Sequence, residues 1–371
     1  MLLAKIQNFS YQKQWRENLE IFDISQTNIN DLPSKCLITI NNKTFAISKW
    51  VSPKRTRSYP YARVYDTFDC SATKIVTIIP LIKDEGKDGD MDYLQWDSVS
   101  LMSLLNIYVI ISYYESAETN TRNPNKLNKI THQRFGNDYI TKQLSELTNY
   151  HQSALHWNLN QLSKENLLSK ITLVKNAYQH ISKILKVQLH NPNNIDKFAT
   201  NLSKNRESFM RYSRQKAQNA QNREFLTLQP KESIGIGEKT KITIENYLGG
   251  YYFFTIDDVI EKDNILYLIE SKHSRDSILP SSDDIKDGLL KLMLYHNLSI
   301  LQDSIGKREF RVILRLTSTT LKSSITLPNT AQNRETFMKN NNFNEKQKSI
   351  LHSLNLESQK NNFTIWLENI Q

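Results

Sequence analysis

The stretch TIDDVIEKDNILYLIESKHS, residues 255–274, constrains the fold more than any other part of this sequence. Two runs rich in Ile, Val and Leu flank EKDN at 261–264, whose residues are typical of tight turns, so the stretch predicts a β-hairpin. The second run, 265–269, is apolar on both faces, which is typical of a strand at the centre of a sheet. Charged residues nevertheless stand in both runs. We therefore expect them to lie where the strands leave the core.

The alternation of side chains along a strand places Glu270 and Lys272 on one face, with Ser271 and His273 on the other. Because the turn folds the preceding strand back, we expect Asp258 to lie across from Glu270. Two carboxylates so placed can hold one Mg²⁺, a hard cation that prefers oxygen ligands and retains waters. Lys272 beside the metal can orient or activate a water and stabilise charge on a phosphate. This set of residues predicts a phosphodiester hydrolase.

The arrangement resembles the PD-(D/E)xK nuclease superfamily, which includes most type II restriction endonucleases. The E-x-K of that family falls on residues 270–272, and its preceding acid falls on the pair Asp257 and Asp258. Hydrophobic residues follow that acid in the family, which selects Asp258, before the hydrophobic residues 259–260; Asp257 is the alternative ligand. This sequence departs from the family pattern in having Ile or Asp, not Pro, before the acid.

The resemblance implies a mixed α/β (α+β) fold with a restriction-endonuclease-like core. That core has the order αβββαβ and a central mixed sheet flanked by helices. The implied catalytic residues are Asp258, Glu270 and Lys272, and the implied cofactor is Mg²⁺, held by Asp258, Glu270 or Asp257. The implied activity is sequence-specific hydrolysis of phosphodiester bonds in double-stranded DNA by a type II restriction enzyme.

A restriction enzyme of this kind implies two partners besides double-stranded DNA. Cutting both strands usually needs two active sites, so the resemblance implies a homodimer. The host DNA must also be protected, so a cognate DNA methyltransferase is expected to be encoded nearby. Two alternatives remain open: a repair, transposon or phage nuclease of the same superfamily, and a non-catalytic DNA-binding protein with a decayed nuclease core.

Changes of pattern divide the chain into four predicted segments. Residues 1–135 alternate short strands with helices, including a hairpin turn at Asn41 and Asn42, and predict an α/β domain suited to DNA recognition. Residues 136–200 repeat leucines at three- and four-residue spacings, which predicts helices. Residues 201–325 contain the predicted nuclease core, from a basic helix at 205–225 to a strand at 310–318. Residues 326–371 predict a polar helical segment.

Basic residues supply the expected DNA contacts. The chain has a formal net charge of +10, which suits a polyanionic partner. Lys and Arg bind phosphates, and Arg also reads guanine edges. The expected contacts lie in a Tyr-rich loop and in the basic helix: Lys54, Arg55, Arg57, Arg63, Arg206, Arg211, Arg214 and Lys216. Ordinary solvated charges are the alternative interpretation.

A second E-x-K, Glu85-Gly86-Lys87, stands in the acidic loop at 84–97. Lys87 need not share a face with Glu85 in a glycine-containing loop, and the neighbouring aspartates miss the EF-hand spacing. We expect a solvated loop here.

The two cysteines, Cys36 and Cys70, are too few for a disulfide framework and favour a reducing cytoplasm. The longest apolar-rich run, 100–114, is shorter than the roughly 20 residues of a spanning helix, so no membrane contact is expected.

Overall fold

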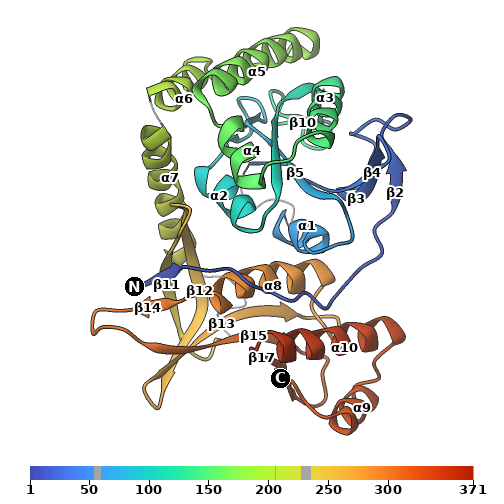
Figure 1. Ribbon diagram of the computed structural model, residues 1–371, viewed down its shortest axis with the longest axis vertical. Coiled ribbons are helices and arrows are strands. Elements are labelled where there is room, and N and C mark those ends of the chain that lie inside the picture. Colours follow the sequence, from blue (N-terminus) through green and yellow to red (C-terminus); the bar gives the residue numbers. More distant parts are fainter. Residues whose placement is uncertain (54–59, 205, 227–234, 371) are drawn as a thin grey trace. The chain divides into compact units, whose positions relative to one another are not determined.

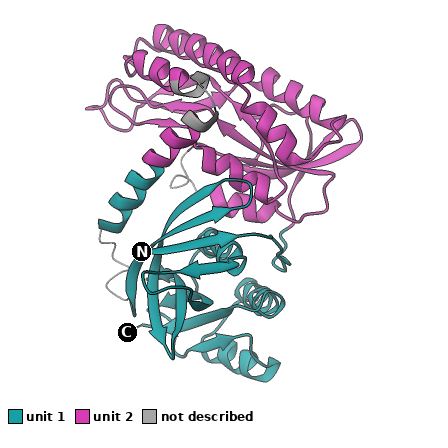
Figure 2. Cartoon of the chain, turned by 60° about the vertical axis from the view of Figure 1, so that its left-hand side comes forward, with its two compact units in different colours: residues 1–17, 217–371 teal, residues 18–216 magenta. Residues whose placement is uncertain are grey.

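A computed structural model describes residues 1–53, 60–204, 206–226 and 235–370 (Figure 1). The chain forms two compact units, coloured separately in Figure 2: unit 1 comprises residues 1–17 and 217–371, and unit 2 comprises residues 18–216. These units group the predicted segments differently. The α/β segment and the helical segment after it belong to one unit, and the first 17 residues join the predicted nuclease segment instead.

Unit 1 is built on an eight-stranded mixed sheet among the described residues. The strand order is β14-β1-β11-β12-β13-β15-β17-β16. The strands are β1 (Leu2–Ile6), β11 (Glu238–Asn246), β12 (Tyr251–Lys262), β13 (Ile265–Ser274), β14 (Ile300–Gln302), β15 (Glu309–Ser318), β16 (Ile325–Leu327) and β17 (Thr364–Asn369). β11, β12 and β13 are antiparallel neighbours, whereas β13 and β15 run parallel.

The predicted hairpin is confirmed as β12 and β13. Lys262 pairs with Ile265, so the turn consists of Asp263 and Asn264. Both turn residues have positive φ, 52° and 62°, as a tight two-residue hairpin turn requires. β13 lies between β12 and β15, and its residues Leu268 and Ile269 are fully buried. The expected central strand is therefore confirmed as well.

Helix α8 (Ser282–His296) connects β13 to the rest of the sheet and packs on β13 and β15. Ser281 caps its start, because the Ser281 hydroxyl accepts a hydrogen bond from the Asp284 amide at 3.1 Å. The helix approaches the sheet closely at Gly288. A Cβ there would lie 2.9 Å from Leu314 Cδ1 and 3.3 Å from Lys272 Cε. Glycine therefore allows α8 to lie directly against the E-x-K strand.

The C-terminal segment, predicted as helical, also contributes strands to the sheet. Helices α9 (Ala331–Asn340) and α10 (Glu345–Lys360) precede β17, which adds in parallel to β15. The N-terminal residues 10–17 lie along this part of unit 1. The buried Glu357 carboxylate of α10 accepts hydrogen bonds from the Tyr11 hydroxyl at 2.9 Å and from the Trp15 amide at 2.9 Å. This explains why the first residues belong to unit 1.

Unit 2 contains a five-stranded sheet of order β2-β3-β4-β5-β8. Its strands are β2 (Ile21–Asp23), β3 (Lys35–Ile40), β4 (Lys43–Lys49), β5 (Lys74–Pro80) and β8 (Tyr108–Ser112). Two hairpins accompany it, β6 (Ile82–Asp84) with β7 (Met91–Tyr93) and β9 (Tyr114–Thr119) with β10 (Ile130–Phe135). The predicted Asn41–Asn42 turn is confirmed, with φ of 48° and 59°.

The helices of unit 2 are α1 (Pro60–Thr67), α2 (Trp96–Leu104), α3 (Asn137–Thr148), α4 (Ala154–Gln161), α5 (Lys164–Leu185) and α6 (Asn193–Lys204). The leucine spacing predicted helices in 136–200, and α3 to α6 confirm it; Leu144 and Leu147 lie in the buried core with Ile38 and Val76. Helix α7 (Arg206–Leu226) begins in unit 2 and ends in unit 1. The fold is thus mixed α+β, as predicted. Within the described residues, no helix has both the length and the apolarity to cross a membrane.

Candidate active site on the β12–β13 hairpin

The register of the hairpin corrects one prediction about the acidic residues. Asp258 pairs with Ile269, not with Glu270. Residues directly opposite each other share a face of the sheet, so Asp258 lies on the face of Ile269 and Ser271. The β12–β13 pairing ends at this pair, and Asp257 is the next residue of β12 beyond it. The expectation that Asp258 lies across from Glu270 is therefore wrong.

β12 also has a β-bulge against its other neighbour, β11, whereas the β12–β13 register runs without a shift from the two-residue turn. On the other side of β12, Glu238 pairs with Val259 and Thr240 pairs with Ile256. Two steps along β11 therefore match three steps along β12, and the extra residue falls at the Asp257–Asp258 pair. A bulge of this kind changes which face a side chain occupies, and it often lies next to a functional site.

The two aspartates have different surroundings. Asp258 is buried, and its Oδ1 accepts hydrogen bonds from the amides of Ile236 at 3.1 Å and Gly237 at 3.0 Å. Its Oδ2 accepts from the Ser271 hydroxyl at 3.3 Å. Asp257 is partly exposed, and its Oδ2 accepts from the Ser271 amide at 3.0 Å. Asp258 therefore holds the loop before β11, and Asp257 is the aspartate that a ligand can reach.

Glu270 is fully buried and lies at the centre of a charged cluster. Its Oε1 is 2.7 Å from Lys291 Nζ and 3.1 Å from Lys272 Nζ. Lys272 Nζ also donates to Asp287 Oδ2 at 2.9 Å. Glu270 and Lys272 thus share one face, as strand alternation predicted, and that face is the one covered by α8.

Asp287 and Lys291 were not predicted from the sequence. They stand four residues apart on α8, which places them on one side of the helix, next to Gly288. That spacing, on the helix that follows the E-x-K strand, is the signal that could have identified them. It is weak alone, because four-residue Asp–Lys spacing is common on solvated helix faces.

The cluster keeps Lys272 charged. Burial lowers the pKa of Lys272, but the nearby carboxylates of Glu270 and Asp287 outweigh this, so the pKa lies above the ordinary lysine value. Lys272 is therefore an ammonium at neutral pH. It can donate to an oxyanion or a phosphate oxygen, but it cannot accept a proton from water.

The donor set suits a metal site of the two-carboxylate kind. Asp257 and Glu270 offer oxygens from neighbouring strands, and Mg²⁺ is commonly bound through one or two carboxylates, with waters and substrate phosphates completing its shell. No larger group fits: within the described ranges, no three His, Cys, Asp or Glu side chains are placed to hold a metal ion together.

In the second E-x-K, at residues 85–87, the two charged side chains are bound to other parts of unit 2. Glu85 is buried and pairs with Lys83 at 2.9 Å and Lys129 at 3.5 Å, whereas Lys87 is exposed and donates to Gln188 Oε1 at 3.2 Å. Gly86 separates them with φ of 86°. The expectation of a solvated loop is wrong for Asp84, Glu85 and Asp92, which are buried, whereas Asp90 is exposed. Glu85 and Lys87 have different partners, as the glycine-containing loop allows.

The predicted DNA contacts fall into three groups. Lys54, Arg55 and Arg57 lie outside the described residues, as does the side chain of Arg206. Arg63 is partly buried and donates to the carbonyl of Lys49 at 2.6 Å, so it fastens α1 to β4. Arg211, Arg214 and Lys216 lie on α7, where Arg211 and Lys216 are exposed and Arg214 is partly buried.

Comparison of the chain with protein-family models, with curated proteins and with solved structures finds no match. Function is therefore inferred from the residues of the site, because a fold by itself does not specify an activity.

Proposed function

We propose that this protein is a Mg²⁺-dependent DNA endonuclease, and that its active site is the charged face of the β12–β13 hairpin. One observation carries the proposal: Glu270 and Lys272 share a face of β13, and the partly exposed Asp257 stands on the neighbouring strand β12, where its carboxylate accepts from the Ser271 amide. A metal ion held by two carboxylates, with a charged lysine beside it, can support phosphodiester hydrolysis.

The order of elements around the hairpin supports the proposal. α7, β11, β12, β13, α8 and β15 occur in this order along the chain, with only the short strand β14 between α8 and β15, which matches the αβββαβ order of a restriction-endonuclease-like core. The last part of α7 is anchored to this sheet, because the buried Gln221 amide donates to the carbonyls of Ile242 at 3.1 Å and Phe254 at 2.6 Å. The parallel pairing of β13 with β15 suits the same core.

Each residue has a role that follows from its position. Asp257 and Glu270 would hold Mg²⁺, which, when bound, would polarise a phosphoryl oxygen and acidify a water. Lys272 donates to the phosphate and stabilises the negative charge that develops when water attacks phosphorus. Lys291 and Asp287 position Glu270 and Lys272. The reaction adds one water to one phosphodiester, leaving one strand end with a hydroxyl and the other with a phosphate.

We further propose that the protein is a type II restriction enzyme. As such it would cut double-stranded DNA at a specific sequence, act as a homodimer, and be accompanied by a DNA methyltransferase encoded nearby. The net charge of +10 supports a polyanionic substrate. The exposed basic side chains of Arg211 and Lys216 on α7 are candidates for phosphate contacts.

The test is incubation of the full chain with plasmid DNA and Mg²⁺. Discrete fragments are expected from a restriction enzyme, and random degradation would indicate a nuclease of another type. Glu270→Gln and Asp257→Asn should abolish cutting and leave DNA binding in gel-shift assays. Lys262→Gln is the matched control, because Lys262 is exposed near the turn of the same hairpin. This variant should cut DNA at the rate of the native chain.

Two results would contradict the proposal. DNA binding without cleavage, in any divalent metal, would favour a non-catalytic DNA-binding protein. Full activity of a folded Asp257→Asn variant and a folded Glu270→Gln variant would place the chemistry elsewhere. Circular dichroism of each variant separates loss of catalysis from loss of the fold.

A further inference from the structure

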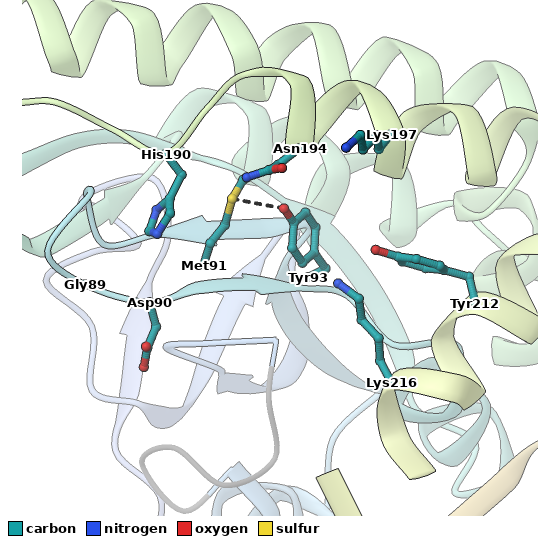
Figure 3. A pocket seen from close by; sticks show the side chains of 9 residues that line it. All are labelled: Gly89, Asp90, Met91, Tyr93, His190, Asn194, Lys197, Tyr212 and Lys216. Atoms are coloured by element: carbon teal, nitrogen blue, oxygen red, sulfur yellow. Dashed lines mark hydrogen bonds between the residues drawn. The ribbon is translucent and has the colours of Figure 1, made fainter. Parts of the chain in front are cut away.

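Unit 2 contains a pocket lined by residues outside the β12–β13 hairpin, and it shares Lys216 with the candidate DNA contacts. Its volume is about 390 Å³, and it lies between β7, the segment after α5, α6 and α7 (Figure 3). A volume of this size suits a small ligand or one unit of a larger one. The lining residues that matter here are Asp90, Tyr93, His190, Asn194, Lys197, Tyr212 and Lys216.

Aromatic rings hold one of the two lysines of the pocket in place. Lys216 Nζ lies 4.4 Å from the centre of the Tyr93 ring and 4.8 Å from that of Tyr212. Figure 3 shows its amino group directed toward Tyr93. Such contacts restrict a lysine without neutralising it. The ammonium is therefore presented to the pocket as a positioned positive charge.

A buried carboxylate fixes the histidine on another side of the pocket. Asp84 is 2% exposed, and its Oδ1 is 2.7 Å from His190 Nδ1. Asp84 Oδ2 also accepts from the His190 amide at 3.2 Å. Because Nδ1 is engaged by Asp84, Nε2 is the ring nitrogen left to face a ligand. The imidazole thus has one defined orientation.

The remaining lining groups add to the positive character of the pocket. Lys197 contributes a second ammonium from α6. Asn194 lies in the first turn of the same helix, where the helix dipole favours negative charge. The single carboxylate of the lining, Asp90, points away from both lysines in Figure 3.

From this lining we propose that the pocket binds the phosphate group of a nucleotide. Lys197 and Lys216 would receive the phosphate oxygens, with His190 and Asn194 as further polar contacts. Two ammonium groups beside a single lining carboxylate favour an anion over a metal cation, and an apolar ligand would gain no charge-assisted contact from them. The phosphate could belong to a free nucleotide or to a nucleic-acid chain. This inference does not rest on the proposed nuclease activity.

Calorimetric titration of the full chain without added divalent metal tests this. The probes are adenosine monophosphate, adenosine, inorganic phosphate and a 5′-phosphorylated oligothymidylate with its unphosphorylated form. We expect adenosine monophosphate to bind at least about tenfold more tightly than adenosine, the factor that one charge-assisted contact supplies. Tighter binding of the phosphorylated oligonucleotide than of the mononucleotide identifies the nucleic-acid source, and the reverse identifies the free nucleotide.

Variants tie the binding to the pocket. Lys197→Gln and Lys216→Gln should each weaken binding of the phosphorylated ligand by about tenfold. Lys216→Arg keeps the charge and the ring contacts and should stay within about threefold. Lys183→Gln, which changes an exposed lysine of α5 outside the lining, is the matched control. Equal binding by the Lys197→Gln, Lys216→Gln and Lys183→Gln variants, or no preference for phosphorylated probes, would overturn the proposal.

Discussion

Exchanging each aspartate of the bulge for asparagine should separate structure from chemistry. In Asp258→Asn, the two amide hydrogen bonds from Ile236 and Gly237 change from charge-assisted to neutral. Each change costs about 1 kcal/mol, so the free energy of unfolding falls by about 2 kcal/mol. In a folding unit of 150–250 residues, 1 kcal/mol corresponds to about 2–4 °C in Tm, so the midpoint falls by about 4–8 °C. Cleavage at 25 °C should persist.

In Asp257→Asn, we expect a small effect on stability and a large effect on cleavage. The hydrogen bond from the Ser271 amide loses its charge assistance, and the side chain is partly exposed, so Tm should fall by less than in Asp258→Asn. Cleavage should fall at least about 100-fold, because a metal-binding carboxylate is lost.

Thermal unfolding followed by circular dichroism, together with initial rates of plasmid cleavage, measures both effects. A folded Asp258→Asn variant that no longer cuts, beside an Asp257→Asn variant that cuts at the native rate, would refute the assignment of Asp257 as the metal-binding aspartate.

Three further predictions concern groups outside the hairpin. Glu85→Ala should lower the Tm, because buried Lys83 loses its partner, but should leave the cleavage rate of the folded protein unchanged; loss of cutting would move the active site to the second E-x-K. Glu357→Gln should lower the free energy of unfolding by about 2–4 kcal/mol in denaturant titrations, because its carboxylate accepts several hydrogen bonds from residues 11–15; an unchanged midpoint would show that this segment does not stabilise unit 1. Burial raises the pKa of Cys36 to about 11, so a thiol reagent at pH 8 should label Cys70 in the native protein and Cys36 only after unfolding; rapid labelling of both would contradict this.

Local sequence was sufficient for the elements around the site. The turn residues predicted the β12–β13 hairpin, and strand alternation predicted that Glu270 and Lys272 share a face. These predictions hold because a two-residue turn and a period of two depend only on neighbouring residues. The order of helix and strands from α7 to β15 was implied by the resemblance, except for the short strand β14.

The choice between Asp257 and Asp258 depended on tertiary structure. The hydrophobic residues after Asp258 favoured it as the ligand, but the amides of Ile236 and Gly237 bond its buried carboxylate, whereas Asp257 is partly exposed. Such contacts involve two segments at once, so the pattern around one of them does not specify them.

What the sequence by itself determined was therefore the mixed α+β class, the hairpin and the shared face of Glu270 and Lys272. Only the tertiary structure decided that Asp258 is bonded by the amides of Ile236 and Gly237, that Asp287 and Lys291 of α8 complete the cluster, and that β1 belongs with the distant strand β11. The physical reason is the range of the interactions. Turn and strand propensities act within a few residues, whereas register, helix packing against Gly288 and the joining of the two chain ends depend on contacts between segments far apart in the sequence.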